Sequence, residues 1–225
     1  MPLDELLRVF DAERNPYMEW HDGPSLQEVD EAMKSLLPRE REAASALVAE
    51  RLRQGYDPYL GRAAELLGTD ECRQALAETL RSATTPGTAA NVARNLLTMG
   101  KSAEAIDTLR AIIANPSLGW STRIDTLVDL KIALASAAGC RPLSDFITPE
   151  FAAVIFAALS DDEYLVRYHA AEALLRAAGD NRPLTEHVPL FKYICGQHPL
   201  NGAPDEADRA GFREAAAILQ AMLKI

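Results

Sequence analysis

Four alanine- and leucine-rich segments that each end at a glycine constrain the fold of this chain more than any other feature. They are DPYLGRAAELLG, AANVARNLLTMG, KIALASAAG and EALLRAAG, and they end at Gly68, Gly100, Gly139 and Gly179. Their apolar residues recur at helical spacing, and glycine readily takes the left-handed conformation that closes a helix. Intervals of 32, 39 and 40 residues separate the four glycines, which is enough for a pair of helices in each interval.

A second helical pattern follows each glycine. The four segments are TDECRQALAETL, SAEAIDTLRAII, TPEFAAVIFAAL and PLTEHVPLFKYI, and they begin near Thr69, Ser102, Thr148 and Pro183. A helix pair repeated at this period is typical of an α-solenoid, in which each pair packs on its neighbours. We therefore predict an all-α fold of stacked antiparallel helix pairs, with eleven or twelve helices in total. The third unit departs from the pattern, because a longer connection precedes its second helix.

Composition agrees with this prediction. Hydrophobic residues make up 48% of the 225 residues, which is enough to bury a substantial core. Ala and Leu are abundant, whereas the β-branched and aromatic residues that favour strands are scarce.

Two segments resemble HEAT-like repeats, a family of armadillo-type α-solenoids. ANVARNLLTMGKSAEAIDTLRAII is similar to the helix, glycine turn and second helix of that family. DDEYLVRYHAAEALLRAAGD is similar to its first helix through Asp162, Val166, Arg167, Ala170, Ala171, Ala173 and Leu174. The resemblance covers roughly residues 56–195. It implies stacked helix pairs and a common role in binding partners, and it carries over no catalytic residue.

Amphipathic helices flank the repeats and are predicted to cap them. We expect one continuous domain with an N-terminal helical cap over residues 1–55, helix-pair repeats over 56–199 and a capping helix in 200–225. Ser25 and Glu28 have the spacing of a capping box at the second helix. The final helix places four apolar residues nearly on one face, namely Phe212, Ala216, Leu219 and Leu223.

Charge and cysteine content limit the class of protein. The net charge of −10 repels polyanions, so we expect a protein partner and no nucleic acid. Three widely spaced cysteines do not form a disulfide framework. The N-terminus lacks the pattern of a signal peptide, and no segment has the apolar length of a membrane span. These features favour a cytoplasmic protein without a membrane partner.

Motifs for catalysis or metal binding are weak. Cys195 and His198 have C-x-x-H spacing near His187, but a structural zinc site needs a second close pair of ligands. No elbow places a nucleophile in a strained turn, and the glycines are separated helix stops that do not form a phosphate-binding loop. We therefore predict no catalytic residue, cofactor or metal. For Arg167 we favour a structural role, with Asp161 or Asp162 capping its helix.

Three groups of residues are candidate partner contacts. The second helix of each pair usually lines the concave side of a solenoid, and the outward residues there are Arg73, Glu78, Asp107, Arg110, Glu186 and Lys192. Residues 142–166 contain no Lys or Arg and carry Asp145, Glu150, Asp161, Asp162 and Glu163. This stretch either steers a basic partner or is a solvated face with acids suited to helix N-termini. Tyr17 and Trp20 lie in the loop NPYMEWHDGPS and either anchor a partner or cover the end of the repeats.

Our first hypothesis is a non-enzymatic protein-binding α-solenoid. Its most specific form is a small acidic inhibitor or immunity-type protein that captures and blocks a basic protein. The second hypothesis is a HEAT-like enzyme or ligand-handling protein that acts on nucleic-acid bases or a chromophore. Cys72, at the start of a predicted helix, would be its reactive thiol. The third is a scaffold subunit whose ends join other solenoids.

Overall fold

Every regular element in the part of the chain that the structure describes is a helix, which confirms the all-α prediction. The structure is a computed structural model, and it describes residues 2–11, 26–100, 102–137, 148–196 and 204–223. Contacts divide the chain into two compact units, residues 1–84 and residues 85–225. The predicted boundary at residue 55 falls inside the first of these units.

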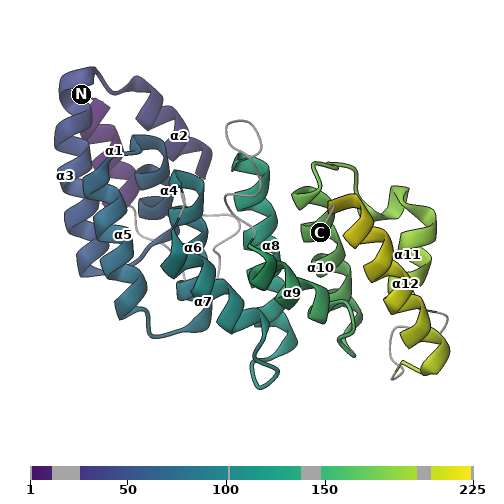
Figure 1. Cartoon of the computed structure of the whole chain (residues 1–225). Coiled ribbons are helices and arrows are strands. Elements are labelled where there is room, and N and C mark those ends of the chain that lie inside the picture. The colour runs from purple at the N-terminus through teal and green to yellow at the C-terminus, as the bar shows by residue number, and fades with distance from the viewer. Residues whose placement is uncertain (1, 12–25, 101, 138–147, 197–203, 224–225) are drawn as a thin grey trace. The chain divides into compact units, whose positions relative to one another are not determined.

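Unit 1 contains five of the helices (Figure 1). They are α1 (Pro2–Asp11), α2 (Leu26–Ser35), α3 (Pro38–Gln54), α4 (Pro58–Leu67) and α5 (Asp70–Ser82). Helix α1 packs with α2, α3 with α4 and α4 with α5, and so do α2 with α4 and α3 with α5. Val48 and Leu76 are fully buried and belong to the core of this unit. Burying one such side chain contributes about 1.5–3 kcal/mol relative to leaving it exposed.

Unit 2 contains the remaining helices (Figure 1). They are α6 (Pro86–Met99), α7 (Ala103–Ile113), α8 (Trp120–Ala137), α9 (Pro149–Ala158), α10 (Tyr164–Ala177), the short 3-10 helix η2 (Leu184–Glu186), α11 (Val188–Cys195) and α12 (Glu206–Leu223). Alternate helices contact one another in two series: α6 with α8, α8 with α10 and α10 with α12, beside α7 with α9. The aromatic rings of Phe151 and Phe212 are buried in this unit.

Helix starts follow the side-chain chemistry of the sequence. Thr69, Thr85, Ser102 and Thr148 each accept a hydrogen bond from the backbone N–H three residues ahead, at 3.1–3.3 Å. Each cap contributes about 1 kcal/mol. The predicted helix starts at Thr69, Ser102 and Thr148 are therefore confirmed.

Helix ends also follow the prediction at three glycines. Gly68, Gly100 and Gly179 all have positive φ, at 66°, 145° and 80°, where a residue with a Cβ is strained. Gly139, the fourth predicted stop, lies outside the described residues, as do Ser25 and its predicted capping box.

Three local predictions are corrected. No single helix begins at Pro183, because proline at position 189 lacks an N–H and the chain forms η2 before α11 begins at Val188. On α12 the fully buried alanine is Ala215, and Ala216 is half-buried. The cap of α10 is Glu163, whose carboxylate accepts from the N–H of Leu165 at 3.3 Å.

Candidate protein-binding groove

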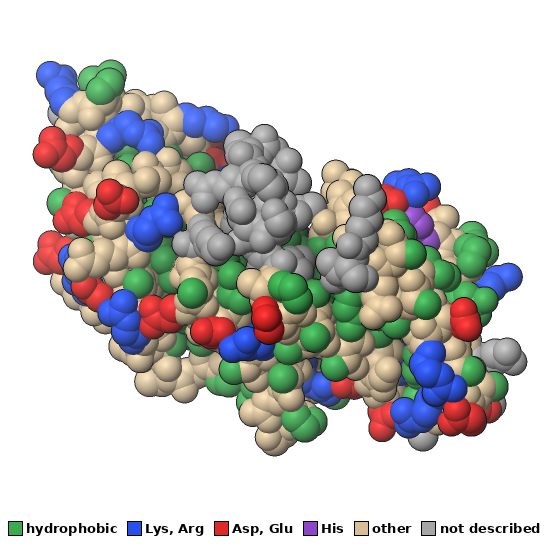
Figure 2. Space-filling view, viewed as in Figure 1, with side chains coloured by type: hydrophobic (Ala, Val, Ile, Leu, Met, Phe, Trp, Pro, Cys, Tyr) green, Lys and Arg blue, Asp and Glu red, His purple; other side chains and the backbone are tan. Residues whose placement is uncertain are grey.

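A groove of about 380 Å³ lies in unit 2 beside α7 and α9, two of the helices predicted to carry partner contacts. We call it the α7/α9 groove, and it is lined by Ile113, Ala114, Pro116, Arg123, Ala153, Val154, Ala157, Ala158 and Asp161. Ala153 and Ala157 are exposed and lie one helical turn apart, so they share a face of α9. In Figure 2, hydrophobic side chains gather over the region of α7 to α9, with charged side chains beside them.

One buried basic side chain lines the groove. Arg123, in the first turn of α8, is 9% exposed and forms an ion pair with Asp161 through its terminal nitrogens. Its Nε is buried and has no hydrogen-bond partner among the described residues. A buried donor without an acceptor costs free energy, so an oxygen of a bound molecule that reached this N–H would remove that cost.

Charged residues that the sequence predicts as partner contacts lie close to one another on α7 and α9, beside the groove. Arg110 and Asp107 on α7 form an ion pair at 2.7 Å. Glu150, in the first turn of α9, is exposed. The pKa of Glu150 is lowered, because its carboxylate accepts hydrogen bonds from its own backbone N–H and from Thr148, and because Arg110 attracts it.

The acidic stretch over 142–166 is largely held by partners within unit 2. Asp161 pairs with Arg123, and Asp162 pairs with Arg209 of α12 at 2.9 Å. Glu163 caps α10. Asp145 lies outside the described residues, so Glu150 is the acid of this stretch, among those described, that is exposed and not in an ion pair.

Of the predicted contacts that the structure describes, only Asp161 lines this groove, whereas Asp107, Arg110 and Glu150 lie on the helices beside it. Arg73 and Glu78 lie on α5 of unit 1, where the Glu78 carboxylate accepts hydrogen bonds from Arg53 at 2.7 Å and from Gln74 at 2.9 Å. Glu186 in η2 and Lys192 on α11 are exposed. Tyr17 and Trp20 lie outside the described residues.

Sequence reasoning missed Arg123, although a signal was present. The first turn of a helix carries partial positive charge, so a basic residue there is unfavourable without an acidic partner. The first turn of α8 contains Arg123 and no acid. This anomaly indicates a partner from elsewhere in the chain, which the structure identifies as Asp161, 38 residues away.

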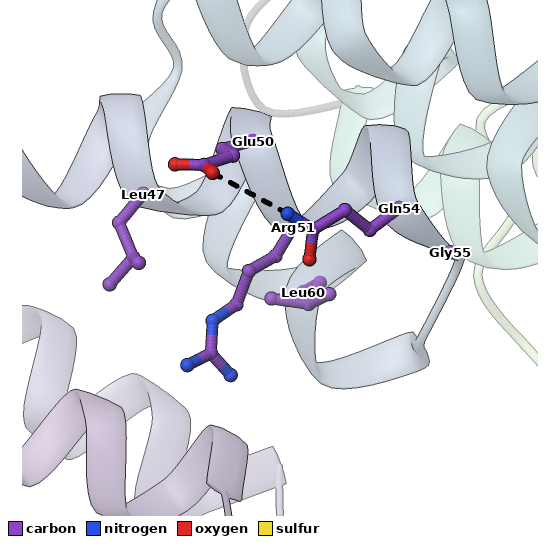
Figure 3. Close-up of a pocket in the computed structure, with 6 residues that line it drawn as sticks. All are labelled: Leu47, Glu50, Arg51, Gln54, Gly55 and Leu60. Carbon is purple, nitrogen blue, oxygen red and sulfur yellow. Dashed lines mark hydrogen bonds between the residues drawn. The ribbon is translucent and has the colours of Figure 1, made fainter.

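A second hollow, of about 510 Å³, lies in unit 1 (Figure 3). It is lined by Leu47, Glu50, Arg51, Gln54, Gly55 and Leu60. Figure 3 shows the amide of Gln54 bonded to Glu50, while the Arg51 side chain points away from this pair. Arg51 bonds Asp11 at 2.6 Å and lies 5.9 Å from the centre of the Phe10 ring. Because its guanidinium is already held by α1, this hollow is the weaker candidate.

Cysteine and histidine side chains do not form a reactive centre in the described residues. Cys72 is fully buried, and its thiol contacts Ser45. Cys195 is half-buried, and burial raises the pKa of its thiol. His187 lies 3.3 Å from Asp180, whereas His198 and Cys140 are outside the described residues.

The described residues contain neither a metal-binding cluster nor a helix that could span a membrane. No group of three or more His, Cys, Asp or Glu side chains is placed to hold a metal ion. Within the same residues, no helix has the length and apolar character needed to cross a membrane.

The α7/α9 groove is therefore defined by its own geometry: small apolar side chains, one partly buried ion pair and one donor without an acceptor among the described residues. A proposal for the function of the groove rests on these residues. Comparisons of the chain with family models, with curated proteins and with solved structures find no match.

Proposed function

We propose that this chain is a non-enzymatic, protein-binding α-solenoid of HEAT-like helix pairs, and that the α7/α9 groove contacts the partner. Contacts between alternate helices in unit 2 support the solenoid interpretation, because stacked pairs bring each helix against its counterpart in the next pair. On this interpretation α7 and α9 are second helices of successive pairs.

The observation that carries the proposal is the combination of small side chains and an unused donor in one groove. Ala153 and Ala157 allow the backbone of a bound segment to approach α9 closely. The Nε–H of Arg123 then donates to a carbonyl or carboxylate oxygen of that segment, which satisfies a group that is otherwise buried without a partner. A peptide segment offers both features, since its backbone supplies carbonyl oxygens at regular spacing.

Charge favours a basic partner. The chain has a net charge of −10, and the exposed carboxylate of Glu150 lies in the first turn of a helix that lines the groove. Such a field accelerates association with a basic protein and weakens as salt is added. The most specific form of the proposal is an inhibitor or immunity-type protein that occupies and blocks a basic enzyme or toxin.

Matched variants of the tagged protein test this proposal. Ala157→Arg fills the groove, and Ala217→Arg makes the same change at an exposed alanine of α12. Both are used to capture partners from the source lysate at low and high salt, with mass spectrometry of the retained proteins. The partner identified with wild type is then purified and its affinity for each variant is measured by calorimetry.

We expect Ala157→Arg to weaken the complex at least about tenfold, because the added side chain must be displaced or accommodated at the contact. Ala217→Arg should leave the affinity unchanged. Glu150→Lys should slow association more than Glu214→Lys, an identical change of net charge on α12. Equal affinities for the two arginine variants would show that the groove is not the contact surface.

A further inference from the structure

A pocket of about 330 Å³ lies between α8, α10 and the segment that precedes η2, apart from the α7/α9 groove. It is lined by Val128, Lys131, Ile132, Glu172, Arg176, Asn181, Arg182 and Pro183. Three of these side chains are cationic and one is anionic, in a chain whose net charge is negative. We call it the α8/α10 pocket.

Two of the three cations are balanced by carboxylates. Lys131 forms an ion pair with Glu172 and lies 3.1 Å from Nδ1 of His169. The Arg182 guanidinium donates to both carboxylate oxygens of Asp180, at 3.1 and 2.6 Å. Glu186 adds a weaker electrostatic attraction to Arg182 but does not line the pocket.

Among the described residues, Arg176 is the cation of this pocket that has no acidic partner. One of its terminal nitrogens donates to the amide oxygen of Asn181, and this neutral group is its partner among the described residues. The side chain is half-buried. Ion pairing within the pocket therefore leaves one positive charge, carried by a guanidinium whose planar shape suits a carboxylate.

The rest of the pocket is apolar. Val128 and Ile132 lie one turn apart on α8, and Pro183 faces them from the other lining segment. Ile132 is 44% exposed, so apolar surface remains for a ligand to cover. A cavity of this volume, with an apolar wall and a few polar groups, has the composition of a small-ligand site.

We infer that the α8/α10 pocket binds an organic monoanion, with a carboxylate on Arg176 and a short apolar body against Ile132, Val128 and Pro183. A single unbalanced charge matches a carboxylate better than a phosphate dianion. Lys131 supports the head group, since an ammonium has three donors. The same chemistry is present in a free short-chain carboxylic acid and in the terminal carboxylate of a peptide that ends in an apolar residue.

Titrations of the ¹⁵N-labelled full chain with hexanoate, 1-hexanol and hexylamine test the inference. Hexanoate should shift the amide signals of α8, α10 and residues 180–183 with a Kd of about 1 mM, as expected for a ligand of this size. The alcohol and the amine should cause no saturating shift there. A short peptide ending in leucine, as the free acid and as the amide, then separates the two sources: tighter binding of the free-acid peptide than of hexanoate identifies a chain terminus.

Variants locate the binding. Arg176→Gln should weaken hexanoate binding at least about tenfold, because a charge-assisted hydrogen bond is lost. Arg213→Gln, at an exposed arginine of α12 paired with Glu206, should leave it unchanged. Ile132→Ser should weaken hexanoate binding about threefold or more, because it removes apolar contact, and it should leave acetate binding unaffected.

Three results would overturn the inference. They are saturating shifts by the alcohol at the same amides, hexanoate binding that survives Arg176→Gln in a variant with native circular dichroism, and no saturable shift with hexanoate or with either peptide. None of these results bears on the α7/α9 groove, since the two sites share no residue.

Discussion

The guanidinium of Arg167 lies over the ring of Phe212, with 4.3 Å between Cζ and the ring centre. The same guanidinium donates to the carbonyl oxygens of Asp161 at 2.6 Å, Asp162 at 3.0 Å and Ile194 at 3.1 Å. One buried side chain therefore connects the start of α10, the end of α11 and the buried face of α12. This geometry confirms the structural role expected for Arg167.

We predict that Arg167→Met lowers the free energy of unfolding by about 2–4 kcal/mol, measured by urea denaturation. The substitution leaves three carbonyl oxygens without a donor and removes the contact with the Phe212 ring. The loss is partly offset, because burial lowers the pKa of Arg167 and a neutral side chain avoids that desolvation cost. Arg213→Met, at an exposed position, should cost less than about 0.5 kcal/mol. Equal stability of the two variants would contradict this role.

Most of the helices could be predicted because their determinants are local. Apolar periodicity, Ser and Thr caps and glycine stops act over a few residues, so the sequence placed the helices of both units to within a few positions. The break between η2 and α11 depends on Pro189 inside an otherwise helical pattern. The contacts of Arg167 with Ile194 and Phe212 span 27 and 45 residues, and only the packing of helices brings these groups together.

Two glycines with positive φ differ in the space available to an added Cβ. Gly179 and Gly196 have similar φ, 80° and 75°. A Cβ at Gly179 meets no atom within 4 Å, whereas a Cβ at Gly196 would lie 2.7 Å from Oδ1 of the buried Asp208. Gly179→Ala should therefore cost about 1 kcal/mol through backbone strain alone. Gly196→Ala should cost about 1–3 kcal/mol more, because Asp208 must move and because the ψ of −178° at Gly196 places it in a region that is essentially restricted to glycine.

The free energies of unfolding of the two alanine variants and of wild type are measured by thermal and urea unfolding. Gly179→Asn serves as a control, since asparagine tolerates the left-handed conformation better than alanine, and it should be more stable than Gly179→Ala. If Gly196→Ala were no less stable than Gly179→Ala, the close approach of Asp208 to Gly196 would be wrong.

The candidate groove was predictable only in part, because charge along the chain does not reveal which acids are already paired. Asp161 and Asp162 belong to an acidic stretch in the sequence, yet their partners, Arg123 and Arg209, come from helices before and after it. Local sequence correctly placed Glu150 at a helix start, where it forms no ion pair with a described residue and feels the charge of Arg110 only from a distance. The candidate contact surface is therefore smaller than the acidic stretch.

Cys72 should react slowly with thiol reagents in the native protein. Its side chain, in the first turn of α5, is fully buried against Ser45. Labelling then requires local opening of the helix. In the variant Cys140→Ser, Cys195→Ser, we expect labelling at least about a hundredfold slower than in urea. Fast native labelling of this single thiol would favour the ligand-handling alternative, which needs Cys72 to be accessible.

The ion pair of Glu172 with Lys131 should make stability depend on pH. Hydrogen bonds from His169 and Lys131, in that order, with a smaller one from Tyr168, lower the pKa of Glu172 from 4.5 to about 2, although burial acts in the opposite direction. Because the folded state has the lower pKa, this stabilisation is complete above about pH 4.5 and is lost as the pH falls toward 2. Glu172→Gln should therefore be less stable than wild type by about 2–3 kcal/mol at pH 6, and the difference should shrink below about 1 kcal/mol near pH 3. Urea unfolding between pH 3 and pH 6 measures the difference directly, with Glu214→Gln as the exposed control.

A difference that stays constant across this range would mean that Glu172 titrates alike in the folded and unfolded chains, and that its pairing with Lys131 contributes nothing that depends on pH.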